Sequence, residues 1–349
     1  MSQPLRETLL KLCRREDLTR EEAREAFLHI MSGEATDAQI GGLLVGLAAK
    51  GSTVEELVGA ASVMREKALP VPTDGIVVDT CGTGGDVRHT FNISTTAAII
   101  TAAAGVKVAK HGNRSASSKS GSADVLEHLG VKLEVTADSL KACLAEANIC
   151  FAFARSHHPA MKFVASARSA LGIPTIFNLL GPLTNPAKAK HQLLGVFAPE
   201  LTDKLANVLR ELGSHRAWVV HAEDGLDELS TMSETRISEL SDGQVKTWML
   251  DATLLDLPKA KLEDLQVSSV MESADAIRGV LAGEKGPKRD IALLNAAAAL
   301  VVAERCDELQ EGMEMAAKAV DSGAAAKALN TLIRLTNLVP AGSEEPSTL

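Results

Sequence analysis

The stretch DTCGTGGDVRHTFNISTTAAIITAAAGVKVAKHGNRSASSKSGSAD, residues 79–124, contains two successive transitions from strand to loop to helix. The first runs from an apolar strand at Ile76–Val78 through a glycine turn at Gly82–Asp86 to an alanine-rich helix that follows Asn92. The second runs from a strand at Val106–Ala109 into a loop rich in Lys, Asn, Arg and Ser. Backbone N–H groups freed by glycine attract anions when helix N-termini lie behind them. The stretch therefore predicts a phosphate site on a sheet covered by helices.

The glycine turn does not match the common nucleotide motifs. Gly82-x-Gly84-Gly85 lacks the later glycine of GxGxxG, and no Gly-Lys-Ser/Thr follows as in a P-loop. A single glycine would indicate only a tight turn with positive φ. Three glycines beside Asp86 favour ligand binding, and Ser94 is placed to offer its hydroxyl to a divalent metal bound to phosphate.

Local positive charge in the second loop supports the same interpretation. Lys110, Arg114 and several serines occur within about ten residues, in a chain of 349 residues whose formal net charge is -9. A flexible solvated loop is the alternative interpretation. Against an acidic background, a basic patch of this kind suits a polyphosphate substrate.

The residues around this stretch predict two kinds of structure. Residues 1–70 indicate four short helices, three of which begin with capping boxes at Thr19, Thr36 and Thr53. After an extended Pro70–Thr73 connector, short apolar runs alternate with helices, which is typical of a mostly parallel sheet. Asp242-Gly243 predicts a hairpin turn. The predicted strands are Ile76–Asp79, Val106–Ala109, Lys132–Val135, Ile149–Ala154, Leu193–Phe197 and Trp218–His221.

The predicted fold class is thus α/β, with a small all-helical domain and a large α/β domain around a mostly parallel central sheet. We expect the helical domain to span residues 1–72 and to include a return segment at about 158–188. The α/β domain then comprises residues 73–157 and 189–349. The apolar faces of so small a helical unit must be buried against something, which favours part of it as a dimer interface.

Composition excludes several classes of function. The negative net charge and an aromatic content of 3% without tyrosine argue against a nucleic-acid partner. The five cysteines form no CxxC pair, which favours reduced thiols in a cytoplasmic enzyme. No run of about 18 apolar residues occurs, so no membrane span is expected.

Five further residues could carry chemistry. Asp227-Glu228 can hold a hydrated Mg²⁺ through adjacent carboxylates, although the pair taken alone is also typical of an ordinary acidic turn. Arg168 on a helix predicted at Ala160–Leu171 suits a carboxylate if it faces a cleft, although a lone arginine is more often a surface residue. His111 and His158, taken by themselves, are expected to be structural rather than ligands.

Several motifs in this order resemble the anthranilate phosphoribosyltransferase family. They are GTGGD, NIST, KHGNRSASSKSGSADVLEHLG, HHPAMKFVASARSALG, FNLLGPLTNP and DGLDE, and the resemblance covers nearly the full chain. The resemblance implies transfer of the phosphoribosyl group from 5-phosphoribosyl 1-pyrophosphate to anthranilate, with Mg²⁺ as cofactor, in L-tryptophan biosynthesis. It also implies a homodimer with a hinged cleft between the two domains.

The resemblance assigns expected roles to individual positions. The positions expected to bind 5-phosphoribosyl 1-pyrophosphate are Gly82, Gly85, Asp86, Thr90, Asn92, Ile93, Ser94, Thr95, Lys110, His111, Gly112, Asn113, Arg114, Ser115, Ala116, Ser117, Ser118 and Ser122. Those expected near anthranilate are Gly82, Asn113, His111, His158 and Arg168, and those expected at the metal are Ser94, Asp227 and Glu228. Lys110 is the expected source of charge stabilisation, and no acid–base dyad is predicted. Pro174 stands where many relatives carry arginine, so it is given no binding role.

Two alternatives share this kind of architecture. A pyrimidine nucleoside phosphorylase would use phosphate and a nucleoside, but KHGNRS together with DGLDE argues against it. A non-catalytic nucleic-acid-binding relative is disfavoured by the acidic charge and by Asp227-Glu228. A purely structural module would leave the clustered Gly, Ser and Lys residues unexplained.

Overall fold

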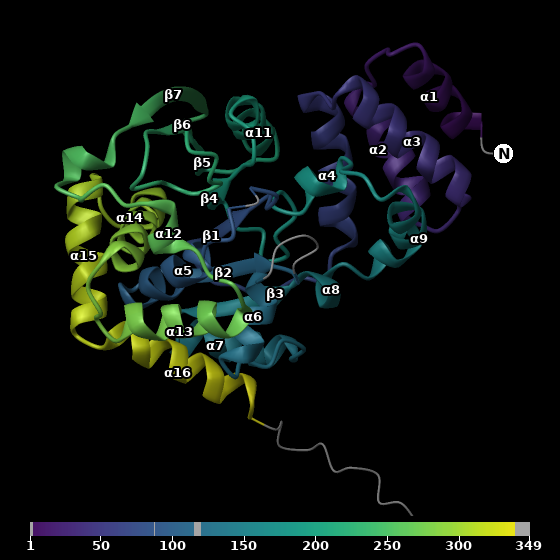
Figure 1. The fold of residues 1–349 in the computed structure, drawn as a ribbon. Helices are drawn as coiled ribbons and strands as arrows, with labels where there is room; N and C mark the ends of the chain where they lie inside the picture. The colour runs from purple at the N-terminus through teal and green to yellow at the C-terminus, as the bar shows by residue number, and fades with distance from the viewer. Residues whose placement is uncertain (1–2, 87, 115–119, 339–349) are drawn as a thin grey trace, which may run out of the picture.

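The computed structural model describes residues 3–86, 88–114 and 120–338. Its N-terminal part is a unit of four helices at one end of the molecule (Figure 1). These are α1 Gln3–Cys13, α2 Arg20–Met31, α3 Asp37–Lys50 and α4 Val54–Lys67. The predicted capping boxes at Thr19, Thr36 and Thr53 are confirmed, and each threonine accepts the N–H of the residue three positions on. These bonds satisfy donors that would otherwise lack partners at the helix starts.

The predicted mostly parallel sheet is confirmed and has seven strands in the order β3-β2-β1-β4-β5-β6-β7. Pairs between neighbours from β3 to β5 are parallel, and β6 and β7 are antiparallel. The strands are β1 Val77–Gly82, β2 Lys107–Gly112, β3 Ile149–Phe153, β4 His191–Gly195, β5 Arg216–Ala222, β6 Thr235–Ser241 and β7 Gln244–Leu250. Asp242 and Gly243 both have positive φ in the β6–β7 turn, which confirms the predicted hairpin.

The predicted strand at Lys132–Val135 is wrong. These residues form an irregular connection between α6 Ser122–His128 and α7 Ala137–Glu146. Val131 and Leu133 are buried in alternation, which produced the strand-like pattern, but the Lys132 N–H donates to Thr336 Oγ1 at 3.2 Å. The alternating apolar side chains therefore pack a loop against a helix, and the segment is not a strand of the sheet.

Alternating side chains on the central strands divide the interior into two apolar clusters. Leu193 on β4 and Val220 on β5 belong to the larger cluster, which contains α5 and α14. Leu194 and Val219, their neighbours in sequence, face the other cluster together with the helical unit. This period of two is what a sheet buried on both faces requires.

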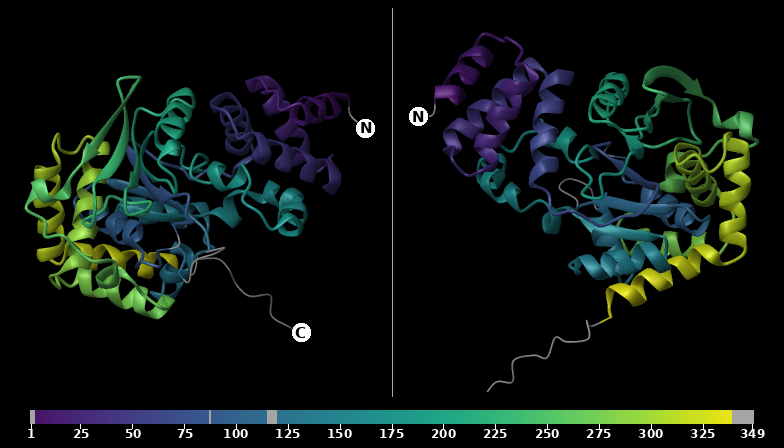
Figure 2. Two further views of the ribbon diagram at one scale, coloured as in Figure 1. Left: turned by 45° about the horizontal axis from the view of Figure 1, so that its top comes forward. Right: turned by 180° about the vertical axis from the view of Figure 1, so that it is seen from behind.

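The remaining helices cover the sheet. Figure 2 shows from behind that α15 and α16 lie on the side of the molecule away from the helical unit. The longer ones are α5 Ile93–Ala103, α9 Lys162–Leu171, α11 Glu200–Glu211, α13 Val270–Leu281, α14 Pro287–Val302, α15 Leu309–Asp321 and α16 Ala324–Thr336. The short ones are α8 Ala154–His157, α10 Phe177–Leu180, α12 Leu262–Leu265 and 3₁₀ turns at Pro159–Met161 and Ala252–Leu255.

The segment between β3 and β4 packs with the N-terminal helices. Val164 and Ala167 on α9 and Phe177 on α10 belong to the same apolar cluster as α1–α4. The rings of Phe27 and Phe177 lie 5.7 Å apart, centroid to centroid. The exact domain limits given above stay a prediction.

Two further expectations concern cysteines and membranes. All five cysteines lie in the described part of the chain and none forms a disulfide. Among the described helices, none combines the length and apolar character needed to cross a bilayer.

Candidate active site

A cleft of 480 Å³ opens at the carboxyl ends of the central parallel strands. Loops that follow β1, β2 and β5 meet there, because parallel strands end at the same edge of a sheet. The cleft is lined by most of the predicted site residues: Gly82, Gly85, Asp86, Thr90, Asn92, Ile93, Ser94, Lys110, His111, Gly112, Asn113, Arg114, Ser122, Asp227 and Glu228.

The glycine turn after β1 bends sharply and keeps its backbone close to the loop after β5. Gly84 and Gly85 have φ values of 64° and 91°, which residues with a side chain rarely adopt. The Gly84 N–H donates to Asp227 Oδ2 at 3.0 Å, and the Thr83 N–H donates to the Gly195 carbonyl at 2.9 Å. The turn is thereby fixed to both neighbouring segments.

Close backbone approach explains two glycines that carry no side chain into the cleft. A Cβ on Gly195, the last residue of β4, would collide with the main-chain carbonyl of Asp227. A Cβ on Gly82 would lie 2.6 Å from Asp227 Oδ2. The absence of side chains at these positions lets the carboxylates of Asp227 and Glu228 reach the cleft.

Asp227 and Glu228 are half-buried residues that line the cleft. Burial and then the nearby Asp86 charge raise the pKa of Asp227 to about 7. Burial and then the charge of Asp227 raise the pKa of Glu228 to about 8. Glu228 Oε1 also accepts the N–H of Ser94, at the start of α5, at 3.2 Å. A divalent cation would relieve the repulsion, and two carboxylates with the Ser94 hydroxyl are the oxygen donors that Mg²⁺ prefers.

Lys110 brings one positive charge to the floor of the cleft. It is 2% exposed, and its Nζ donates to the Thr80 carbonyl and to Ser94 Oγ, the latter at 3.3 Å. Burial lowers the pKa of Lys110, while the nearby charge of Asp79 opposes that shift. An anionic ligand in the cleft would favour the charged ammonium.

The two predicted wall histidines lie together. His111 Nε2 and His158 Nε2 are 3.2 Å apart, and both rings are buried. Burial, with the neighbouring histidines adding to it, lowers the pKa of His111 to about 3 and that of His158 to about 4. Both rings are therefore neutral at pH 7 and form an uncharged wall, although only His111 lines the cleft.

Asn92 connects the two loops of the opening stretch. Its Oδ1 accepts from Ser120 Oγ and from Ser273 Oγ, each at 2.8 Å. The backbone N–H of Asn92 donates to Ser273 Oγ at 3.1 Å. Helix α13, which carries Ser273, thus helps to hold the end of the second loop over the start of α5.

Three predicted site residues do not line the cleft, and four cannot be placed. Thr95 is buried in α5, and His158 lies behind His111. Arg168 lies with its guanidinium carbon 4.9 Å from the centroid of the Phe177 ring. Ser115, Ala116, Ser117 and Ser118 lie outside the described residues.

Arg114 lines the cleft but is paired outside it. Its guanidinium donates to Asp124 at 3.0 Å and to Glu127 at 2.8 Å on α6. The same group lies 5.9 Å from the centroid of the Phe153 ring. These contacts orient the side chain along α6, so Arg114 would have to leave them to contact a substrate.

Sequence reasoning missed several lining residues. They are Cys81, Thr83, Gly84, His89, Phe91, Pro174, Asn178, Phe197, Ser120, Gly121 and Val267. Some of these lie inside the motifs quoted above, so their place was detectable. Asn178 lies inside FNLLGPLTNP, whereas Pro174, Phe197 and Val267 lie outside the quoted motifs, and no local pattern marks them as cleft residues.

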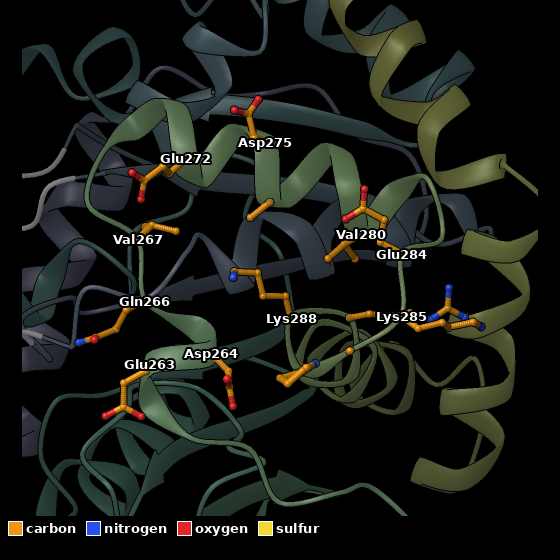
Figure 3. Close-up of a pocket in the computed structure, with 14 residues that line it drawn as sticks. Glu263, Asp264, Gln266, Val267, Glu272, Asp275, Val280, Glu284, Lys285 and Lys288 are labelled. Carbon is orange, nitrogen blue, oxygen red and sulfur yellow. The ribbon is translucent and has the colours of Figure 1, made fainter.

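A second cavity of 690 Å³ shares one lining residue, Val267, with the cleft. Its walls come from α12, α13 and the start of α14 (Figure 3). Figure 3 shows carboxylates of Glu263, Glu272 and Asp275 together with Lys288 around it. It contains neither the glycine turn nor the carboxylates with raised pKa values, so we assign the chemistry to the cleft at the carboxyl ends of the strands.

Comparison with protein families matches both parts of the chain. Residues 6–68 match a glycosyl transferase family helical bundle domain, and residues 74–326 match a glycosyl transferase family a/b domain. The anthranilate phosphoribosyltransferase of Desulfosudis oleivorans is 51% identical over 332 residues, which cover 95% of this chain and 98% of that protein. The enzyme of the same name from Agrobacterium fabrum is 49% identical over 97% of this chain and 99% of its own length.

Solved structures give the same result. The anthranilate phosphoribosyltransferase of Thermus thermophilus superposes with a TM-score of 0.89 at 40% identity, covering 95% of this chain and 99% of that one. The Saccharomyces cerevisiae enzyme in complex with PRPP, 5-phosphoribosyl 1-pyrophosphate, and Mg gives a TM-score of 0.87 at 26% identity. That match covers 96% of this chain and 98% of the yeast chain.

Proposed function

Because this chain belongs to the anthranilate phosphoribosyltransferase family and has the activity of that family in tryptophan biosynthesis, we propose a role in the reaction for each part of the cleft. The observation that carries the assignment of roles is the convergence of Asp227, Glu228 and Lys110 on the glycine turn. A bound anion would balance the charge of Lys110, and a divalent cation would balance the charges of Asp227 and Glu228. 5-Phosphoribosyl 1-pyrophosphate with Mg²⁺ provides both.

The pyrophosphate is proposed to bind between the glycine turn and the start of α5. N–H groups at the N-terminus of α5 and in the Gly82–Asp86 turn provide donors for phosphate oxygens. Lys110 at the floor contributes a fixed positive charge as negative charge develops on the departing group. Thr90, Asn92 and Ile93 complete this part of the site.

The phosphoribosyl group is proposed to bind beside the segment from Lys110 to Ser122. His111 and Gly112 are the last residues of β2, Asn113 follows them, and Ser122 Oγ donates to the Asn113 carbonyl at 3.4 Å. A Cβ on Gly112 would lie 2.8 Å from the Phe151 ring, so a side chain there would push the segment from its place. Asn113 is then positioned where the two substrates meet.

The metal is proposed to be Mg²⁺, held by Asp227, Glu228 and the Ser94 hydroxyl. When bound, Mg²⁺ neutralises charge on the pyrophosphate and makes it a better leaving group. The carboxyl groups have raised pKa values, so they must lose any bound protons before they can act as ligands. Close positioning and charge stabilisation then account for catalysis, because the neutral amine of anthranilate needs no strong base.

Anthranilate is proposed to enter from the side of the helical unit. The neutral His111–His158 pair offers an uncharged wall, and Asn178 and Pro174 border the cleft beside it. Arg168 is proposed to attract the anthranilate carboxylate, since Phe177, on which its guanidinium stacks, is the neighbour of Asn178. Closing of the two domains would bring the guanidinium nearer to the cleft.

The full chain is proposed to be a homodimer that associates through the helical unit. Leu10 on α1 is 45% exposed and Val45 on α3 is 41% exposed, so both helices present apolar surface to solvent. We expect Val45→Asp to lower the sedimentation coefficient of the full chain from that of a dimer to that of a monomer. A wild-type chain that sediments as a monomer at micromolar concentration would contradict the proposal.

The double variant Asp227→Asn, Glu228→Gln tests the metal site. Loss of both charges removes the attraction for Mg²⁺, so we expect a fall in activity of about 100-fold or more and a much higher Mg²⁺ requirement. The measurement is the loss of anthranilate fluorescence during a Mg²⁺ titration, with reactions that omit each substrate or Mg²⁺ as blanks. Glu223→Gln, an exposed acid on the same loop, is the matched control. An unchanged Mg²⁺ dependence in the double variant would remove both residues from the site.

Arg168→Ala tests the anthranilate site. Loss of a charge-assisted contact is worth about 1.5–3 kcal/mol, so we expect the KM for anthranilate to rise about 10- to 100-fold. The KM for 5-phosphoribosyl 1-pyrophosphate should change by less than about twofold, since Arg168 is not among the pyrophosphate residues. Arg155→Ala, an exposed arginine on α8, is the control of equal charge. Equal effects on both KM values would contradict the assignment.

A further inference from the structure

We propose that His191, His215 and Glu304 form a binding site for one divalent transition-metal ion of the Zn²⁺ type. His191 is the first residue of β4, His215 immediately precedes β5, and Glu304 follows α14. The site lies at the amino ends of these strands, whereas the cleft lies at their carboxyl ends. It is therefore separate from the proposed Mg²⁺ site.

Backbone pairing holds the two histidines side by side. The His215 N–H donates to the Lys190 carbonyl at 2.8 Å, and His191 pairs with Arg216 in the parallel ladder. The rings of His191 and His215 lie 5.3 Å apart, centroid to centroid. The two imidazoles thus lie at the starts of neighbouring strands, where a small ion could join them without movement of the backbone.

Two of the separations, each to a different oxygen of Glu304, match those of tetrahedral coordination. His191 Nε2 lies 3.5 Å from Glu304 Oε2, and His215 Nε2 lies 3.4 Å from Glu304 Oε1. The possible ligand atoms all lie within 4.8 Å of one another. Bonds of about 2.0–2.2 Å in a tetrahedral zinc site separate neighbouring ligand atoms by about 3.3–3.6 Å. A small rotation of either imidazole would complete the geometry.

His191 supplies a second, independent indication of a ligand. The residue is 5% exposed, and its Nε2 is a buried atom without a hydrogen-bond partner among the described residues. Buried polar atoms are normally satisfied, so an unpartnered nitrogen that faces a carboxylate and a second imidazole needs an explanation. A metal ion bound to the nitrogen lone pair provides one.

An ordinary ion pair explains these contacts less well. The two histidine–carboxylate distances exceed the 2.7–3.2 Å usual for such hydrogen bonds.

The ligand types decide which metals suit the site. Two imidazoles and one carboxylate favour Zn²⁺, Cu²⁺ or Ni²⁺ over Mg²⁺, which prefers oxygen ligands. The side chains of His215 and Glu304 are 57% and 40% exposed, so an ion can enter and water can occupy the fourth position. A bound ion would connect the starts of β4 and β5 to the end of α14, and so would stabilise the folded chain.

The test is calorimetric titration of Zn²⁺ into the tag-free full chain in excess Mg²⁺, which occupies oxygen-only sites. We expect one Zn²⁺ per chain, and at least about tenfold weaker binding in His215→Asn and in Glu304→Gln. His128→Asn, an exposed histidine on α6, is the matched control and should bind as the wild type does. Zn²⁺ should raise Tm in the wild type and in the control but not in the two site variants.

Co²⁺ in place of Zn²⁺ gives a visible absorption spectrum, which would not change if the three residues only stabilised the fold. A tetrahedral site with two imidazoles should give strong visible absorption, which His215→Asn should abolish. The proposal fails if the wild type binds no Zn²⁺ in excess Mg²⁺, or if His215→Asn and Glu304→Gln bind it as tightly as the wild type. A lower Tm in both variants with unchanged Zn²⁺ binding would show an ion pair only and would equally overturn it.

Discussion

The close contact between the end of β4 and the main chain at Asp227 is the constraint on which the active cleft depends. Gly195 has no side chain, so the loop after β5 can lie directly on the end of the neighbouring strand. From there Asp227 reaches the glycine turn after β1, and Glu228 reaches the start of α5. One missing Cβ therefore permits three loops from separate strands to share one small volume.

That contact has an electrostatic consequence. It places two half-buried carboxylates close together, which raises the pKa of each. Lys110 lies below them, with its own pKa lowered by burial. Without ligands the site therefore holds charged groups in an environment that disfavours their charge. An anionic substrate with a divalent cation provides the compensating charges, which is why the same cleft suits 5-phosphoribosyl 1-pyrophosphate.

Local patterns predicted much of this architecture because their causes are local. The capping threonines, the Asp242-Gly243 turn and the apolar strands each act within a few residues, and the structure has them. The failure at Lys132–Val135 has a tertiary cause. Its alternating apolar residues pack in a loop beside α16, and the Lys132 N–H is bonded to a threonine side chain and not to a strand.

In the candidate site, too, the residues that local patterns mark could be predicted, and those that only tertiary contacts bring in could not. The residues of the two glycine- and serine-rich loops could be predicted because each loop is continuous in sequence. Phe197 and Val267 could not, because only the folded chain brings their segments to the cleft. No local pattern connects His191 with Glu304 either, because their proximity depends on the packing of α14 against β4.

Kinetics of Gly195→Ala test the central claim most directly. The added methyl group must displace the Asp227 backbone, and a displacement of about 1 Å at an active site can cost about 100-fold in rate. We therefore predict a fall in kcat/KM for 5-phosphoribosyl 1-pyrophosphate of about that size. Gly181→Ala, where a Cβ would meet no atom within 4 Å, should be close to the wild type. A Gly195→Ala enzyme within twofold of the Gly181→Ala control would contradict the account.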